Sequence, residues 1–310
     1  MISRRSFVKL AAASAAMPAV AAAASGRDGS RAFAFALNTA TIRGYRLPLK
    51  EQISAAVRAG FEGIEPWVSD LAAAEKTPGA LEDARKMCSD SGLQVVSAIG
   101  FAQWAVNDPA ERAKGLEQMK RDMELVAKIG GQRIAAPPAG VYNKEVKLEL
   151  DAAAERYRLV LELGDKTGVI PQVEFWGKSA NISTLAQALY VAIAASHPKA
   201  CVLADVFHMY MGNSGFDNLR ALTSSMSQVF HMNDYPADPP RGKAQDSDRV
   251  WPGDGIAPMA KIFGHFRTNA VYPWLSLELF NPEYWKLPVD EMLATGIAKL
   301  RRVAQAPKRT

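Results

Sequence analysis

Three carboxylates and one histidine stand at the ends of short apolar runs in the second half of this 310-residue sequence. Glu174 ends the run VIPQVE and Asp205 ends ACVLAD. His231 lies in QVFHMN, and Glu278 lies in WLSLELF. A buried carboxylate is costly unless a positive charge compensates it, and carboxylate and imidazole ligands together suit Mn, Zn, Co or Mg. We therefore predict that these four side chains bind one divalent cation.

Each of these residues has a simpler explanation when it is considered alone. Glu174 could pair with an Arg or Lys at the rim of the core. Asp205 could cap the loop after its strand, and His231 could be a structural histidine whose hydrogen bonds are satisfied. Their occurrence at four corresponding strand ends favours the metal site over four separate structural roles.

The elements that must position these residues follow one rhythm from Phe33 onward, namely a helix, a glycine, a short apolar strand and a loop. Proline near the first turn and glycine at the C-terminal cap are typical helix boundaries. Pro48 opens the first helix, and the glycines predicted to end helices are Gly60, Gly92, Gly130 with Gly131, and Gly168. The eight predicted strands lie in FAFALN, FEGIEPWV, LQVVSAI, RIAAP, VIPQVEFW, ACVLAD, QVFHMN and WLSLELF. Their Val, Ile and Leu content, with little alternation, is typical of buried parallel strands.

Eight such units in a chain of this size predict a single-domain α/β fold, the closed (β/α)8 TIM barrel, over residues 33–306. The alternative is an open doubly wound sheet, but no GxGxxG loop follows the first strand, where FALNTATIRG stands. Barrel active sites form at the C-terminal ends of the strands, so the four candidate ligands would converge there. The long segment from Asn233 to Pro258 interrupts the repeat, and we expect a loop over the barrel mouth.

The N-terminus has the pattern of an export signal. SRRSFVKL, with Arg4 and Arg5, precedes an Ala-rich stretch and the small-residue exit AAAASG, as in a twin-arginine signal. We predict a signal peptide over residues 1–24, a linker over 25–32, export by the twin-arginine machinery and a periplasmic location. Loss of Arg4, Arg5 and Lys9 would lower the formal charge from +5 to +2. This balance predicts no nucleic-acid partner, and no other apolar run is long enough for stable membrane insertion.

The two cysteines are far apart in the sequence. Cys88 lies in a helical pattern and Cys201 opens a strand. A disulfide between them is an alternative in an oxidising compartment, but twin-arginine substrates generally cross the membrane already folded. We therefore expect two buried thiols.

Six short motifs give the chain a family resemblance. They are GFEGIEPW around Glu65, VEFW with Glu174, the Asp-x-x-His of Asp205 to His208, HMNDY from His231, WPGDG from Trp251, and LELF with Glu278. With them the chain resembles the xylose isomerase-like barrel family, in particular its sugar isomerase/epimerase branch. The resemblance implies that Glu174, Asp205, His231 and Glu278 are the metal ligands and that His208 contacts a substrate oxygen. It also makes a homo-oligomer an open expectation.

A metal flanked by two glutamates suits proton abstraction next to a carbonyl, through an enediolate. One of Glu174 and Glu278 would remove the proton and the other would return it, giving epimerisation or isomerisation. Loss of a β-substituent would give dehydration instead, so a lyase acting on a keto-cyclitol or 3-keto-glycoside is the alternative. Mn is the favoured metal, with Mg, Co and Zn as alternatives. Export favours a neutral sugar or keto-sugar as the substrate, because sugar phosphates are mainly cytoplasmic.

Further residues are predicted to line the substrate site. Those expected to contact substrate are His208, Trp176, Glu65 and Arg241. The alternative for Glu65, which its position favours, is to hold the loops together through hydrogen bonds. Arg241 is one of three basic residues that follow His231, and the sequence does not separate it from Lys243 and Arg249 as the substrate-binding residue. Trp67, Phe101 and Trp104 lie at or just beyond strand ends, where they could stack on a sugar or simply pack at the barrel rim.

Two other classes of protein are considered. A nuclease related to endonuclease IV would need a cluster of extra histidines for three zinc ions, whereas this chain has four histidines in all. A non-catalytic sugar-binding protein would not need paired bases. The small number of histidines disfavours the nuclease, and the paired glutamates disfavour the binding protein, so the sequence favours an enzyme of the isomerase type.

Overall fold

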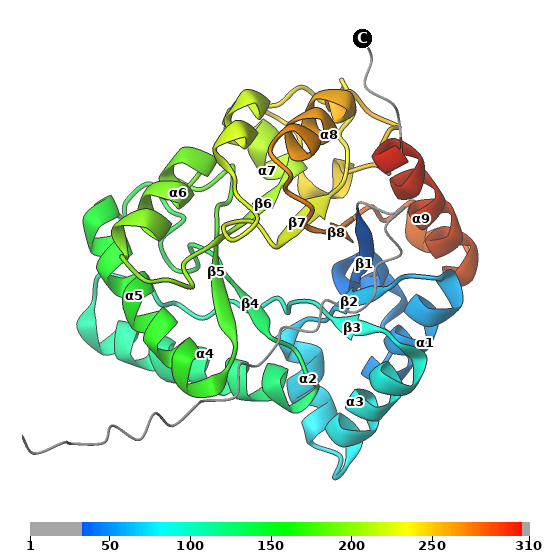
Figure 1. Ribbon diagram of the computed structural model, residues 1–310, viewed down its shortest axis with the longest axis horizontal. Helices are drawn as coiled ribbons and strands as arrows, with labels where there is room; N and C mark the ends of the chain where they lie inside the picture. The colour runs from blue at the N-terminus through cyan, green and yellow to red at the C-terminus, as the bar shows by residue number, and fades with distance from the viewer. Residues whose placement is uncertain (1–32, 306–310) are drawn as a thin grey trace, which may run out of the picture. The chain divides into compact units, whose positions relative to one another are not determined.

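Eight short strands, all paired in parallel, form the inner wall of the protein, as Figure 1 shows. The computed structural model describes residues 33–305, so the predicted signal peptide and linker lie outside the described residues. The strands are β1 (Ala34–Asn38), β2 (Gly63–Glu65), β3 (Gln94–Val95), β4 (Arg133–Ala136), β5 (Ile170–Glu174), β6 (Val202–Asp205), β7 (Val229–Met232) and β8 (Trp274–Leu277). Each corresponds to one predicted run.

The sheet closes on itself. Its strand order is β3-β2-β1-β8-β7-β6-β5-β4, so the first strand pairs directly with the last. On the opposite side, the backbone N–H of Ala135 in β4 donates to the carbonyl of Ala98, just after β3, at 2.8 Å. Closure of this kind leaves no free sheet edge. The predicted single (β/α)8 barrel is confirmed.

Helices surround this barrel as an outer ring (Figure 1). They are α1 (Leu49–Ala59), α2 (Val68–Glu75), α3 (Ala80–Ser91), α4 (Pro109–Lys128), α5 (Leu150–Thr167), α6 (Leu185–Ala194), α7 (Val206–Met211), α8 (Met259–Thr268) and α9 (Val289–Gln305). Short 3-10 helices cover Thr39–Tyr45, Phe216–Ala221, Asp246–Asp248 and Tyr284–Lys286. The predicted boundary glycines Gly60 and Gly168 cap α1 and α5 with φ of 81° and 78°, a left-handed conformation that glycine adopts at no steric cost.

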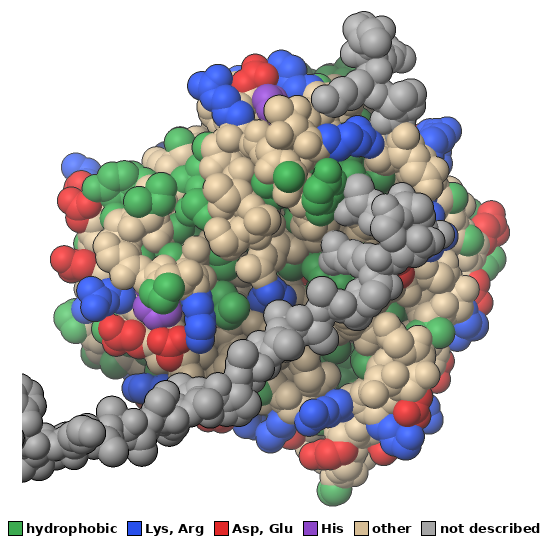
Figure 2. All heavy atoms as spheres, viewed as in Figure 1, with side chains coloured by type: hydrophobic (Ala, Val, Ile, Leu, Met, Phe, Trp, Pro, Cys, Tyr) green, Lys and Arg blue, Asp and Glu red, His purple; other side chains and the backbone are tan. Residues whose placement is uncertain are grey.

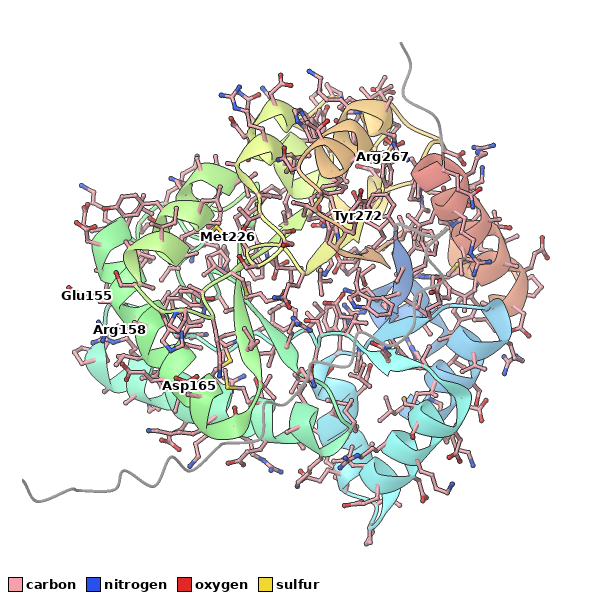
Figure 3. All side chains as sticks on the ribbon, in the orientation of Figure 1. Glu155, Arg158, Asp165, Met226, Arg267 and Tyr272 are labelled. Carbon is pink, nitrogen blue, oxygen red and sulfur yellow. The ribbon has the colours of Figure 1, made fainter. Side chains whose placement is uncertain are left out.

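Each large helix turns one apolar face to the sheet. In α5, Val160 is buried, whereas Glu155, Arg158 and Asp165 lie at the outer rim (Figure 3). Charged side chains accordingly gather around the edge of the face seen in Figure 2. This division is the amphipathic pattern of a helix that packs on a barrel.

Two hydrophobic clusters fill the fold. The larger lies between sheet and helices and includes Leu37, and the smaller comprises Ala36, Val96, Ile99, Ala135, Leu203 and Val229. Neighbouring residues of β1 belong to different clusters because successive strand side chains point to opposite faces. The smaller cluster therefore fills the inside of the barrel, and polar groups beyond it lie at the strand ends.

Strand register places the polar strand-end residues side by side. Asp205 of β6 is opposite His231 of β7, and His231 is opposite Ser276 of β8. Asn38 of β1 is opposite Glu65 of β2. The parallel pairing of β5 to β8 and of β8 to β1 and β2 thus brings residues from distant parts of the chain to one end of the barrel.

The segment from Asn233 to Pro258 was predicted to be a loop over the barrel mouth. In the structure it is a long connection with one short 3-10 helix, and Asp234 holds it in place. The carboxylate of Asp234 accepts backbone N–H bonds from Tyr235, Gly253 and Ala257 at 2.8 to 2.9 Å. Asp234 also pairs with Val250 as an isolated antiparallel bridge. These bonds fix the path of the loop and hence the position of the residue just before Val250, Arg249.

Both cysteines are buried and free, as predicted. Burial raises the pKa of the Cys88 thiol to about 11 and that of Cys201 to about 12, so both remain protonated near neutral pH. Within residues 33–305, no helix combines the length and apolar character that crossing a bilayer would require.

Candidate metal centre and active site

Asp205, His231 and Glu278 form a buried cluster at the C-terminal ends of β6, β7 and β8. His231 Nδ1 lies 3.2 Å from Glu278 Oε2 and 3.8 Å from Asp205 Oδ2. One ligand atom of each residue lies within 4.8 Å of the others. Among the described residues, His231 Nδ1 is buried and has no partner with good hydrogen-bond geometry, although it faces two carboxylates. This is the arrangement expected of side chains that share a cation.

Glu174, the fourth predicted ligand, lies at the end of β5 and lines the same cavity as Glu278. It is not part of the close group of three. Its Oε2 atom is buried without a hydrogen-bond partner among the described residues. The pKa of Glu174 is raised to about 8, chiefly by burial; the nearby carboxylates Glu278 and Asp205 also raise it, and the charge of His231 lowers it. An uncompensated carboxyl group therefore faces the cavity beside the cluster.

Glu65 holds the His231 ring from behind. Its Oε2 atom lies 3.0 Å from His231 Nε2 and accepts hydrogen bonds from Ser276 Oγ at 2.7 Å and Asn38 Nδ2 at 3.1 Å. Glu65 is fully buried and does not line the cavity. The structure thus places this residue, which we predicted to contact substrate, where it fixes the imidazole and turns Nδ1 toward Asp205 and Glu278. A carboxylate behind a ligand histidine is the usual support of metal sites.

The charges of the cluster act on His231 and Glu65 together. Burial alone would lower the pKa of His231, but the carboxylates of Glu278 and Glu65 raise it well above its ordinary value. Burial would raise the pKa of Glu65, but the charge of His231 and its hydrogen bond lower it. Two carboxylates, Glu65 and Glu278, thus lie against the single imidazole of His231.

Arg249 supplies a second compensating charge. Its Nη1 atom donates to Asp205 Oδ2 at 3.0 Å and to Glu278 Oε2 at 2.7 Å. Its Nη2 atom donates to Asp246 Oδ1 at 2.5 Å. Burial would raise the pKa of Asp205, but the charges of Arg249, His208 and His231, of which Arg249 has the largest effect, lower it to about 2. Asp205 is therefore compensated by this guanidinium, in addition to the Asn233 Nδ2 donor at 2.8 Å.

Arg249, not Arg241, is the arginine that lines the cavity. It is 1% exposed and lies over the rings of Phe207 and Phe280, at 4.8 and 5.0 Å from their centroids. Arg241 is exposed and donates to Asn213. Contact between Arg241 and substrate stays a prediction, and Arg241 is not among the residues that line the cavity. The sequence does not single out Arg249, because the position of a side chain in a long loop is set by the anchors at Asp234 and Val250. The sequence feature that could have pointed to Arg249 is the acid three residues before it, Asp246, which pairs with it just ahead of WPGDG.

His208 lies where it can meet a substrate oxygen. Asp205 Oδ1 accepts its backbone N–H at 2.7 Å, so Asp205 also caps α7 and fixes the loop. The ring lines the cavity, with Nε2 3.4 Å from Arg249 Nη2, and Nδ1 is buried without a described partner. Burial is the largest influence and lowers the pKa of His208. The imidazole of His208 is therefore neutral and lines the cavity, with its Nδ1 atom buried and its Nε2 atom beside Arg249.

The cavity next to these groups has a volume of about 340 Å³ and an aromatic wall. Its aromatic lining residues are Trp67, Phe101, Tyr142, Trp176 and Phe280. Trp176 lines it as predicted, whereas Trp104 is fully buried and donates to the carbonyl of Pro137 at 2.9 Å. An apolar wall with a few convergent polar groups is typical of a small-molecule site.

These residues fit a divalent cation. The donor set contains one imidazole nitrogen and carboxylate oxygens, the chemistry that Mn, Zn, Co and Mg accept. His231 Nδ1 and Glu174 Oε2 are buried and unpartnered, and Glu65 supports the imidazole. Arg249 compensates Asp205 and Glu278. The buried Glu174 Oε2, however, has no partner among the described residues, so a cation beside it would offset the cost of its burial.

The sequence profile of the xylose isomerase-like TIM barrel family matches residues 53–303. The chain therefore belongs to this family. An inosose isomerase of Bacillus velezensis is 23% identical over 250 residues, which is 80% of this chain and 89% of that protein. A 3-dehydro-D-guloside 4-epimerase of Escherichia coli is 23% identical over 204 residues, or 61% of this chain and 73% of that protein.

Two further similarities extend the comparison. A 3-dehydroshikimate dehydratase of Pseudomonas putida is 23% identical over 258 residues, 81% of this chain but only 39% of that protein. A crystal structure of the IOLI protein with a bound zinc atom superposes with a TM-score of 0.81 at 21% identity, covering 88% of this chain and 98% of that one. The relatives are isomerases, epimerases and dehydratases, and the structural likeness agrees with the barrel fold.

Proposed function

We propose that the protein is a divalent-metal-dependent isomerase or epimerase of a neutral sugar or keto-sugar that removes a proton next to a carbonyl. The observation that carries this proposal is the placement of Glu174 and Glu278 on one cavity beside the Asp205–His231–Glu278 cluster. Relatives that isomerise inosose or epimerise a keto-sugar support it. A three-zinc nuclease would need a cluster of extra histidines, whereas this chain has four histidines in all, and mere sugar binding would not need paired bases.

Asp205, His231 and Glu278 would hold the metal, with Glu174 as the fourth ligand. A bound divalent cation would supply the positive charge that stabilises the oxyanion of an enediolate. We favour Mn, with Mg, Co and Zn as alternatives, and the zinc in the similar IOLI structure shows that one barrel of this shape accepts such an ion. Glu65 would orient His231, and Asn233 and Arg249 would hold Asp205 in place.

Glu174 and Glu278 would move the proton. Proton transfer is most efficient when the pKa of the catalytic group lies near the working pH; burial raises the pKa of Glu174 above its ordinary value, and a bound cation would lower it again. Glu174 would remove the carbon-bound proton, and Glu278 would return one from the opposite face. His208 and the guanidinium of Arg249, which both line the cavity, would hold the substrate oxygens and share the negative charge that develops.

The fate of the proton decides the product. Return to the same carbon gives an epimer, and return to the neighbouring carbon gives the isomer. Loss of a β-substituent gives dehydration, and the dehydratase relative makes this the second candidate. The test is to incubate the protein and Mn with a neutral keto-sugar, a keto-cyclitol and a sugar phosphate, and to identify products by NMR. We expect an epimer or isomer from a neutral substrate. Activity on the phosphate alone would contradict the proposal, and a conjugated enone would support the dehydratase.

We also propose export to the periplasm by the twin-arginine route, on the basis of the Arg4-Arg5 motif and the Ala-rich stretch that follows it. Replacing Arg4 and Arg5 with Lys is expected to leave the precursor in the cytoplasm, because the machinery recognises the arginine pair. Cell fractionation with an antibody measures the distribution. Continued export of this variant by the general secretory route would contradict the twin-arginine assignment.

A further inference from the structure

The aromatic wall of the cavity is longer than one sugar ring requires. Trp67 and Phe101 have ring centroids 5.0 Å apart, Phe101 and Trp176 are 6.2 Å apart, and Trp176 and Tyr142 are 6.4 Å apart. Each ring is tilted by 50° to 58° to its neighbour. The four rings therefore form one continuous surface, with three successive spacings from one ring centroid to the next. A pyranose ring covers about one such step.

The inner end of this wall is tied to the catalytic carboxylates. Trp67 Nε1 donates to Asn38 Oδ1 at 3.3 Å, and Asn38 Nδ2 donates to Glu278 Oε1 at 3.0 Å. A ring held at Glu278 would therefore have Trp67 beside it, and Phe101, Trp176 and Tyr142 continue the wall outward from there.

The outer end of the wall reaches solvent. Phe101 is 39% exposed and Tyr142 is 51% exposed, while both line the cavity. They come from the loops after β3 and β4. Exposed aromatic residues that continue a cavity mark a surface that a ligand covers, in contrast to single aromatic side chains scattered over a protein.

Unused hydrogen-bond donors accompany the outer rings. Trp67 Nε1 is bonded within the protein, but neither Trp176 Nε1 nor the Tyr142 hydroxyl has a partner in the described part of the chain. Lys178 on the rim donates to Gln245 Oε1 at 2.6 Å, and Asp246 is paired with Arg249. Lys178 keeps its charge because its partner is a neutral amide, and the aromatic faces with free donors suit a ring that carries hydroxyl groups.

We propose that the Phe101–Trp176–Tyr142 surface binds a second sugar ring, glycosidically linked to the keto-sugar that reacts at Glu174 and Glu278. The substrate is then a neutral keto-disaccharide, not a free monosaccharide. This inference rests on the proposed function, because it takes the reacting ring to lie at those glutamates. The second ring stacks on Trp176 and Tyr142 and bonds to their free donors.

The test compares 3-keto-glucose with 3-keto-maltose, whose keto ring is the same and which adds one glucose ring. Tyr142→Ala is expected to lower kcat/KM for 3-keto-maltose by roughly threefold to tenfold, the effect of one lost aromatic contact. The same variant should leave 3-keto-glucose unchanged within about twofold. Tyr190→Ala is the matched control, because Tyr190 is 45% exposed on α6, away from the cavity lining. It should change neither substrate.

Binding measured by calorimetry separates the subsite from the reaction. Turnover of both sugars with an equal effect of Tyr142→Ala on each would overturn the subsite and leave the proposed function standing. No turnover of either sugar, with tighter binding of 3-keto-maltose that Tyr142→Ala abolishes, would support the subsite and overturn the function. Neither turnover nor binding of 3-keto-maltose would overturn both.

Discussion

Glu174→Gln is expected to lower turnover by about 100- to 10,000-fold, the usual contribution of a positioned proton acceptor. Glutamine keeps the size of the side chain and one oxygen ligand but cannot accept the proton. Glu174 Oε2 is buried and unpartnered, so the substitution breaks no protein hydrogen bond at that atom. Initial rates, with metal content measured by mass spectrometry, give the result. Metal content should fall far less than turnover.

Glu278→Gln should show the same loss, but it carries one further change. Glu278 Oε2 accepts from Arg249 Nη1 at 2.7 Å, and an amide weakens that ion pair. The melting temperature of this variant is therefore measured beside its rate. The control is Glu162→Gln. Glu162 is exposed on α5, where it pairs with Arg158, so its change should leave the rate and the melting temperature unaltered. Near-native turnover of both active-site variants would exclude each glutamate as the base.

The second large effect is loss of the metal from His231→Ala. Removing a supporting group behind a ligand usually costs about 10- to 100-fold in metal affinity, so removing the ligand itself should cost more than about 100-fold. Activity should fall in parallel. Equilibrium dialysis against Mn, with metal quantified by mass spectrometry, measures the affinity.

His208→Ala is the matched control for His231→Ala. His208 lies on the same cavity but outside the close group of Asp205, His231 and Glu278. It should retain the metal and weaken substrate binding or turnover instead. Thermal melting of both variants separates metal loss from unfolding. Equal metal affinity of His231→Ala and the native protein would contradict the assignment of His231 as a ligand.

The strand ends were predictable because the repeat has a physical cause. A helix, its capping glycine and a buried parallel strand recur with little ambiguity, and the C-terminal ends of barrel strands must meet. Asp205, His231 and Glu278 follow from that rule alone. The third strand was predicted over LQVVSAI, yet only Gln94–Val95 forms the ladder, and the wall continues through Ala98 and the isolated bridge between Trp67 and Ile99.

The roles of Glu65 and Arg249 depend on contacts that no local pattern contains. Glu65 reaches His231, 166 residues away, only because β1 pairs with β8 and closes the barrel. Arg249 enters the site because Asp234 fixes a long loop through three backbone bonds. Loop residues have no periodicity, so Arg241 and Arg249 looked alike in the sequence. Strand position is thus predictable, and the direction of a loop side chain is not.

The most direct test of metal-dependent proton abstraction is deuterium entry from solvent into the substrate. The protein is stripped with a chelator, divided, and half is reloaded with Mn before incubation with a neutral keto-sugar in deuterated water. NMR then follows the carbon next to the carbonyl. The proposed mechanism predicts exchange with the reloaded protein. With the stripped protein or with Glu174→Gln, exchange should be slower by at least about 100-fold. Equal exchange by stripped and reloaded protein, or product formation without deuterium at that carbon, would contradict it.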